Sequence, residues 1–198
     1  MQDSRPAASS QPLTDAQIAQ ATIGDLPLHN APITLAEYDP AWPEHFARED
    51  QRMRNALGPC VVRIEHVGST SVPGLAAKPI IDILLIVADS ADELSYVPAL
   101  EEVGYVLRIR EPEWHQHRLL KGPDININLH VFTVGSAEIE RMLAFRDWLR
   151  DHPADRDLYA RTKRALAQRE WRYVQNYADA KAEVVEEIIA RARAGSAL

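Results

Sequence analysis

The chain has 198 residues, 46% of them hydrophobic, which is enough for one buried core and too little for two full domains to be expected. Its net charge of -7 argues against broad adhesion to nucleic acid or anionic lipid, because both need a positive surface. We expect no membrane span, no secretion signal and, with Cys60 as the single cysteine, no internal disulfide. These features predict a cytoplasmic protein with no membrane partner and no nucleic-acid partner.

Residues 1–32 are predicted to be a flexible appendage. Residues 1–13 are rich in Ser, Pro and Ala, which favours a disordered tail. Thr14, followed three residues later by Gln17, predicts a short capped helix that the next Gly and Pro residues end. The domain itself is expected to cover residues 33–194.

The elements of this domain mix helices and strands without strict alternation. The first helix is predicted at 43–57, where Phe46, Met53 and Leu57 share one face. The other predicted elements are strands at 60–67, 80–87 and 105–110, a helix at 91–103, a hairpin around a turn at 121–124, and helices at 137–150, 155–168 and 172–194. This order predicts an α+β fold, a small mixed sheet with flanking helices and a helical carboxyl-terminal part.

A glycine-serine turn follows the strand at 60–67. Gly68, Ser69 and Thr70 place backbone N–H groups and hydroxyls at one strand tip, and glycine lets a ligand approach the backbone closely. The same residues also suit a capped turn in which the hydroxyls satisfy nearby backbone groups. The turn alone therefore indicates either a phosphate site or a structural cap.

Asp82 interrupts the apolar strand at 80–87. An ionised carboxylate in a central strand needs a partner, because its burial is otherwise costly. Lys78, four residues earlier, is a candidate partner for Asp82 or for a phosphate. We therefore expect either a buried Asp-Lys contact or a binding site at this position.

The predicted hairpin carries polar side chains on one face. With 121–124 as the turn, His117 is expected opposite Asn128, and His115 opposite His130. Asn126 joins this polar face, and the other face carries Ile125, Ile127, Leu129 and Val131. We interpret the polar face as a ligand-binding surface, with a histidine metal site and a plain solvated surface as the alternatives.

The carboxyl-terminal helices supply weaker signals. Tyr177 and Lys181 are four residues apart, so they project together and are candidates for ligand contact. Tyr159 and Lys163 are another pair at this spacing. Ordinary packing and salt bridges on a helix face explain the same pattern.

Several motifs together resemble one family. EYDPAWP, RIEHVGSTSVPGLAAKPIIDILL, NLHVF, FRDWLR and NYADAK are similar to motifs of the GrpB family, also called UPF0157, over roughly residues 33–192. The resemblance implies a nucleotidyltransferase-like fold. Domains of this family also occur fused to dephospho-coenzyme A kinase in some bacteria.

The superfamily pattern implies which residues would act. Its Gly-Ser turn and its first acid match Gly68-Ser69 and Asp82, but Leu84 stands in place of the second acid. Neutral or basic side chains stand where the third acid is expected, namely Asn126, Asn128 and His130. The usual two-metal arrangement is therefore incomplete.

Two functions follow from the resemblance. The first is a nucleotidyltransferase-like enzyme, and the second is a non-catalytic module that binds a nucleotide or a coenzyme A-related metabolite. The residues expected to bind the substrate and its phosphates are Gly68, Ser69, Thr70, Lys78, Asn128, Tyr177 and Lys181. The expected catalytic residues are Asp82, which would also bind Mg²⁺, and His115, His117 and His130.

Overall fold

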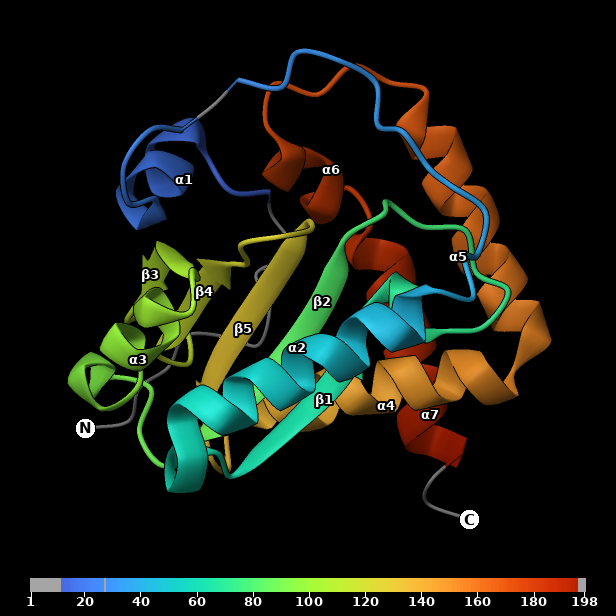
Figure 1. The fold of residues 1–198 in the computed structure, drawn as a ribbon. Coiled ribbons are helices and arrows are strands. Elements are labelled where there is room, and N and C mark those ends of the chain that lie inside the picture. The colour runs from blue at the N-terminus through green and yellow to red at the C-terminus, as the bar shows by residue number, and fades with distance from the viewer. Residues whose placement is uncertain (1–11, 27, 196–198) are drawn as a thin grey trace, which may run out of the picture.

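The protein is described from a computed structural model, which describes residues 12–26 and 28–195. Its centre is a five-stranded sheet in the order β1-β2-β5-β4-β3, with helices against both faces (Figure 1). The strands are β1 Arg63–Val67, β2 Ile81–Val87, β3 Val106–Glu111, β4 His117–Lys121 and β5 Ile127–Thr133. β2 and β5 run parallel, and the other neighbouring pairs are antiparallel. This mixed sheet confirms the predicted α+β class.

The helices agree with the sequence prediction in order and differ in some of their bounds. They are α1 Asp15–Ala21, α2 Trp42–Leu57, α3 Val97–Glu102, α4 Ala137–Asp151, α5 Pro153–Ala167, α6 Val174–Asp179 and α7 Ala182–Gly195. The helix predicted at 91–103 is shorter than expected, and the one predicted at 172–194 is interrupted between α6 and α7. None of the described helices combines the length and the apolar character needed to cross a membrane.

The hairpin of β4 and β5 differs in register from the sequence prediction. Lys121, not His117, lies opposite Asn128, so the predicted register is wrong. The connection after Lys121 covers residues 122–126 and is longer than the predicted turn. The pairing is displaced by an even number of positions, so His117, Asn128 and His130 keep the shared face that the sequence predicts.

Alternate residues of β2 belong to two different apolar layers. Ile83 and Leu85 pack in the main core, to which α2 and α3 contribute on one face of the sheet. Leu84 and Ile86 lie on the opposite face, where α4 covers them. β2 is therefore buried on both faces, as its apolar sequence predicts.

The carboxyl-terminal helices build a second layer beside the sheet. α4, α5 and α7 share an apolar cluster that includes Leu149, Tyr159 and Ile188. In Figure 1, α4 and α7 lie behind the sheet, and the short α6 lies beyond one end of β2 and β5. That end is where these two parallel strands begin, because side chains from α6 and from the first residues of both strands line one pocket.

Part of the predicted appendage lies against the domain. α1 begins with the predicted capping box of Thr14 and Gln17. Thr22 then pairs with Ile109 of β3, and Ile18 is buried. The domain boundary at residue 33 stays a prediction, and residues 1–11 of the predicted flexible segment lie outside the described residues.

Candidate functional site

A pocket of about 280 Å³ opens where β2 and β5 begin. The turn after β1 forms one wall, and α5, α6 and Lys181, which directly precedes α7, enclose the opposite side. Its polar lining residues are Ser69, Thr70, Lys78, Asp82, Asn128, His130, Lys163, Gln175, Tyr177 and Lys181. Residues from distant parts of the chain therefore meet at one end of the sheet, and we call this the lysine pocket.

The turn after β1 brings its backbone against Asp82. Gly68 has a φ of 68°, in the region that favours glycine. A Cβ atom added at Gly68 would lie 2.9 Å from the Cβ of Asp82 and would also collide with the carboxylate. Glycine is therefore required here both by the backbone conformation and by the close approach of Asp82.

The hydroxyls of the turn make structural hydrogen bonds, line the lysine pocket, or do both. Thr70 donates to the carbonyl of Ile80 at 3.1 Å, and Ser71 donates to the carbonyl of Gly68 at 2.6 Å. Both hydroxyls thus stabilise the turn, as the structural alternative predicts. Ser69 and Thr70 also line the lysine pocket, whereas Ser71 does not.

Asp82 presents its carboxylate to the pocket, with 27% of its side chain exposed. The amide of Asn128 donates to Oδ1 at 2.7 Å, and Nε2 of His130 lies 3.8 Å from the same oxygen. Burial alone would raise the pKa of Asp82, but His130, Asn128 and the charge of Lys78 favour the ionised form and lower the pKa below its usual value. Asp82 is therefore a carboxylate at neutral pH.

A chain of hydrogen bonds leads away from the pocket behind His130. Nε2 of His117 is 3.0 Å from Nδ1 of His130, and Nδ1 of His117 is 2.7 Å from the carboxylate of Glu111. Burial lowers the pKa of His117 to about 4, so this ring is neutral at pH 7. A neutral His117 that donates Nδ1–H to Glu111 accepts at Nε2, and His130 must then donate Nδ1–H. Nε2 of His130 is left facing Asp82.

All four lysines of the chain lie at or beside this pocket. Lys78, Lys163 and Lys181 line it, and Lys121 donates a hydrogen bond to the lining residue Asn128. The lining holds three ammonium groups and the single carboxylate of Asp82. The pocket is therefore positive, although the whole chain carries a net charge of -7.

Two of the ammonium groups are held in place by polar or aromatic partners. Lys163 is 2% exposed, and its Nζ donates to the hydroxyl of Ser69 at 2.9 Å and to the carbonyl of Ala76. Nζ of Lys181 lies 4.5 Å from the ring centre of Tyr177, which is a cation-π contact. These partners orient the ammonium groups without neutralising their charge.

The charges of the lysines are poorly compensated by other side chains of the pocket. Burial lowers the pKa of Lys163 to about 7 and the pKa values of Lys78 and Lys181 to about 8. The charge of Lys181 adds to the lowering at the other two lysines, because like charges repel. A bound anion would relieve this repulsion, which is the electrostatic character of an anion site.

The donor set does not fit the two-metal site that the resemblance implies. Leu84, at the second acid position, is fully buried in the apolar cluster beneath α4. On β5, Asn128 lies opposite Asp82 and His130 lies opposite Leu84, so neither position supplies a carboxylate. Within residues 12–26 and 28–195, no three His, Cys, Asp or Glu side chains form a group suited to a metal ion. Lysines instead supply the positive charge of this pocket.

Most of the predicted site residues meet in the lysine pocket. The predicted residues in its lining are Gly68, Ser69, Thr70, Lys78, Asp82, Asn128, His130, Tyr177 and Lys181. His117 lies behind His130, outside the lining. His115 is exposed in the turn before β4, with a φ of 52° and its ring against Trp114. Its expected place opposite His130 is wrong, because β4 begins only at His117.

Sequence reasoning does not select Lys163 as a site residue. This residue bonds to Ser69, which is 94 positions away in the chain. The one local signal is its spacing from Tyr159, whose ring centre lies 4.7 Å from Nζ of Lys163. Because the same spacing occurs on any helix with a buried face, it does not distinguish a site residue from a packed one.

The domain is of the α+β class, with a small mixed sheet that carries the lysine pocket where its two parallel strands begin. The family model described as "GrpB protein" matches residues 32–191, and the chain belongs to the GrpB family. It is 62% identical over 190 residues to a UPF0157 protein of Halalkalibacterium halodurans, covering 96% of this chain and 97% of that protein. The crystal structure of GrpB from Enterococcus faecalis superposes with a TM-score of 0.71 at 34% identity, covering 80% of this chain and 96% of that one.

Two further similarities concern proteins with other names. A dephospho-CoA kinase of Mycolicibacterium paratuberculosis is 32% identical over 167 residues, which are 70% of this chain and 40% of that protein. A chain of Cid1 poly(U) polymerase superposes with a TM-score of 0.42 at 13% identity, covering 67% of this chain and 44% of that one. The second similarity is a distant likeness of fold alone.

Proposed function

We propose that this protein binds a nucleotide or another phosphorylated metabolite in the lysine pocket. The observation that carries the proposal is that Lys78, Lys163 and Lys181 line one pocket, in which Lys163 bonds to the hydroxyl of Ser69. Ammonium groups that outnumber the carboxylates around them attract phosphate oxygens, and N–H groups of a glycine-containing turn supply further donors. The pocket of about 280 Å³ suits a small ligand more than a polymer.

Calorimetric titration tests this proposal directly. We expect ATP, GTP or a phosphorylated coenzyme A precursor to bind without Mg²⁺, and Lys163→Gln to weaken binding about tenfold or more, because a charge-assisted hydrogen bond contributes roughly 1.5–3 kcal/mol. Arg164→Gln is the matched control, since Arg164 is the next residue on α5 and pairs with the exposed Glu37. Absence of binding by all of these ligands, or equal weakening by both variants, would contradict the proposal.

Nucleotidyl transfer is a second candidate function. It is favoured by the position of Asp82 and His130 in the same pocket as the lysines. In this scheme an acceptor hydroxyl attacks the α-phosphorus, gives its proton to the Asp82 carboxylate and displaces pyrophosphate. The lysines would neutralise the charge that develops on the leaving pyrophosphate.

Product analysis separates transfer from binding alone. Nucleoside triphosphates are incubated with candidate acceptors and the products are identified by mass spectrometry. We expect Asp82→Asn to abolish product formation while ATP binding is retained, because the lysines remain. Equal turnover by the wild type and by Asp82→Asn would exclude Asp82 as the proton acceptor.

A further inference from the structure

The Ser69 hydroxyl differs from the other two hydroxyls of the turn after β1. Thr70 and Ser71 donate to backbone carbonyls, whereas Ser69 bonds to two side chains, Nζ of Lys163 at 2.9 Å and the hydroxyl of Tyr159. Ser69 is half-buried and lines the lysine pocket together with Lys163. The turn therefore presents to the cavity one hydroxyl that is not used to hold the backbone of the turn.

Lys163 is placed to take a proton from Ser69. Burial lowers the pKa of Lys163 to about 7, and the positive charges of Lys181 and Arg164 lower it further, against the opposite effect of Asp82. A large fraction of Lys163 is therefore a neutral amine at pH 7. The lone pair of this amine accepts the Ser69 proton across the same 2.9 Å.

The other partner of Ser69 does not compete for this proton. Burial raises the pKa of Tyr159 to about 12, so its hydroxyl stays protonated at neutral pH. A phenol that keeps its proton donates to Oγ while Ser69 gives its own proton to Lys163. Tyr159 and Lys163 are four residues apart on α5, so both reach Ser69 from one helix.

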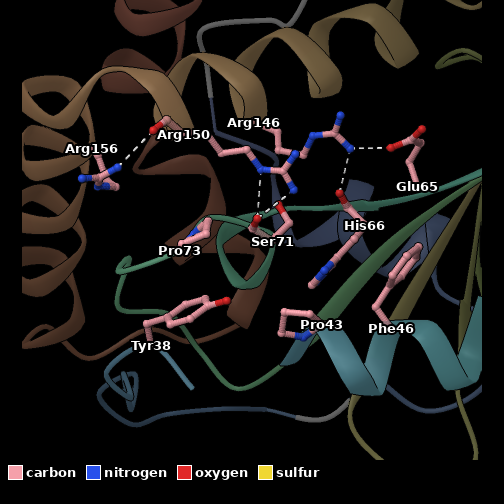
Figure 2. A pocket seen from close by; sticks show the side chains of 10 residues that line it. All are labelled: Tyr38, Pro43, Phe46, Glu65, His66, Ser71, Pro73, Arg146, Arg150 and Arg156. Carbon is pink, nitrogen blue, oxygen red and sulfur yellow. Dashed lines mark hydrogen bonds and ion pairs between the residues drawn. The ribbon is translucent and has the colours of Figure 1, made fainter. Parts of the chain in front are cut away.

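The turn that carries Ser69 is also held from a second side. His66 and Ser71 border a separate pocket, which Figure 2 shows. There Arg146 donates to the carbonyl of His66 at 3.0 Å, and Arg150 donates two hydrogen bonds to the carbonyl of Ser71 at 3.1 and 2.9 Å. Both arginines belong to α4, so this helix fixes the backbone before and after Ser69. A hydroxyl on a fixed turn keeps its distance to the neighbouring amine.

We propose that Ser69 and Lys163 act as nucleophile and general base in the hydrolysis of carboxylic esters. This activity is distinct from nucleotidyl transfer, in which neither side chain would react. The reacting group must be uncharged, because a phosphate against Lys163 would keep this amine protonated and unable to accept a proton. The pair of side chains therefore needs no nucleotide in the lysine pocket.

The reaction has two balanced steps. In the first, Oγ of Ser69 attacks the ester carbonyl carbon and its proton passes to Nζ of Lys163, after which the bond to the leaving alcohol breaks and the alcohol takes this proton. In the second, Lys163 takes a proton from water, the water oxygen attacks the ester formed on Ser69, and Oγ leaves with the proton from Lys163. Lys78 and Lys181 line the same pocket, and their positive field favours the negative charge on the carbonyl oxygen in both steps.

Hydrolysis of p-nitrophenyl acetate tests this proposal. We expect repeated turnover, and mass spectrometry of protein quenched with acid during turnover should locate an acetyl ester on Ser69. Ser69→Ala should abolish the turnover, and Lys163→Gln should slow it about a hundredfold or more, because general-base catalysis is lost. Arg161→Gln, an exposed position on the same helix outside the pocket lining, should keep the wild-type rate.

The pH profile of the wild type tests the role of Lys163 without any substitution. The rate of ester cleavage should rise from pH 6 to pH 8 with a midpoint near 7, because Lys163 loses its proton over this range. A flat profile, an unmodified Ser69 during turnover, or equal rates for the wild type and Ser69→Ala would overturn the proposal. Ester cleavage that ATP does not suppress would count against nucleotide binding in the lysine pocket and not against the roles of Ser69 and Lys163.

Discussion

Lys163 places a buried ammonium group where a phosphate would neutralise it. Its pKa is lowered to about 7, and those of Lys78 and Lys181 to about 8, so these groups lose protons as the pH rises from 7 to 8. A bound anion stabilises the protonated forms and raises the three pKa values. Anion binding above pH 7 should therefore be accompanied by proton uptake.

Calorimetry at pH 8 in buffers of different ionisation enthalpy measures this uptake. We expect on the order of one proton per bound ATP, less in Lys163→Gln, and an affinity that falls as the pH rises from 7 to 9. Proton release on binding, or an affinity that is flat over this range, would contradict the assignment of the lysines as the anion ligands.

His117 is expected to have one fixed tautomer at neutral pH. Its pKa is lowered to about 4, and its Nδ1 faces the Glu111 carboxylate. Nitrogen-15 NMR at pH 7 should therefore show a protonated Nδ1 and an unprotonated Nε2. Glu111→Gln should weaken this preference, whereas a wild-type ring protonated at both nitrogens at pH 7 would show that His130 is not oriented in this way.

At the scale of elements, the turn after β1 requires glycine at position 68 for two reasons, a positive φ and the close approach of Asp82. Gly68 and Gly74 both have positive φ values, 68° and 77°, but only a Cβ at Gly68 meets Asp82, whereas one at Gly74 meets no atom within 4 Å. Gly74→Ala should lower the free energy of unfolding by about 1 kcal/mol. Gly68→Ala should cost about 2 kcal/mol more and abolish anion binding.

Denaturant unfolding of the two alanine variants measures the difference. Because both changes remove the same glycine freedom, the gap between them reports the collision with Asp82. Equal stabilities, together with nucleotide binding retained in Gly68→Ala, would show that the turn and β2 can separate without loss of the pocket.

Leu84 belongs to the packing of α4 on the sheet and not to the pocket. Leu84→Asp should lower the free energy of unfolding by about 3 kcal/mol or more, because an unpaired carboxylate would be buried in an apolar cluster. Leu84→Met, which keeps the volume, should cost less than about 1.5 kcal/mol. A folded Leu84→Asp protein that gains Mg²⁺ binding in titration would contradict this placement.

At the scale of the whole molecule, the sequence predicts features that depend on neighbouring residues but not those that depend on long-range packing. The apolar run of β2 and the capping box of α1 depend on residues close in sequence, and the structure confirms both. The hairpin register depends on loop length, the loop is longer than a two-residue turn, and the predicted register is wrong. The approach of Lys163 to Ser69 depends on how α5 folds back over the sheet, which no local spacing encodes.

The lysine pocket would give an acidic chain a local site for a small anion. Three lysines and one aspartate line this pocket, so the rest of the sequence is more acidic than the net charge of -7 of the whole chain. Under the function proposed for this pocket, we expect small anions to bind better than polymers, because a polymer would also meet the surrounding negative field.

The gathering of all four lysines at one end of the sheet also bears on covalent chemistry. Acylating reagents attack neutral amines, and a pKa of about 7 or 8 leaves a far larger neutral fraction at physiological pH than an ordinary lysine has. Every acylated lysine side chain on this protein would then lie at or beside the lysine pocket. Mass spectrometry of such adducts, with and without a protecting ligand, would give a footprint of the pocket without any change to the sequence.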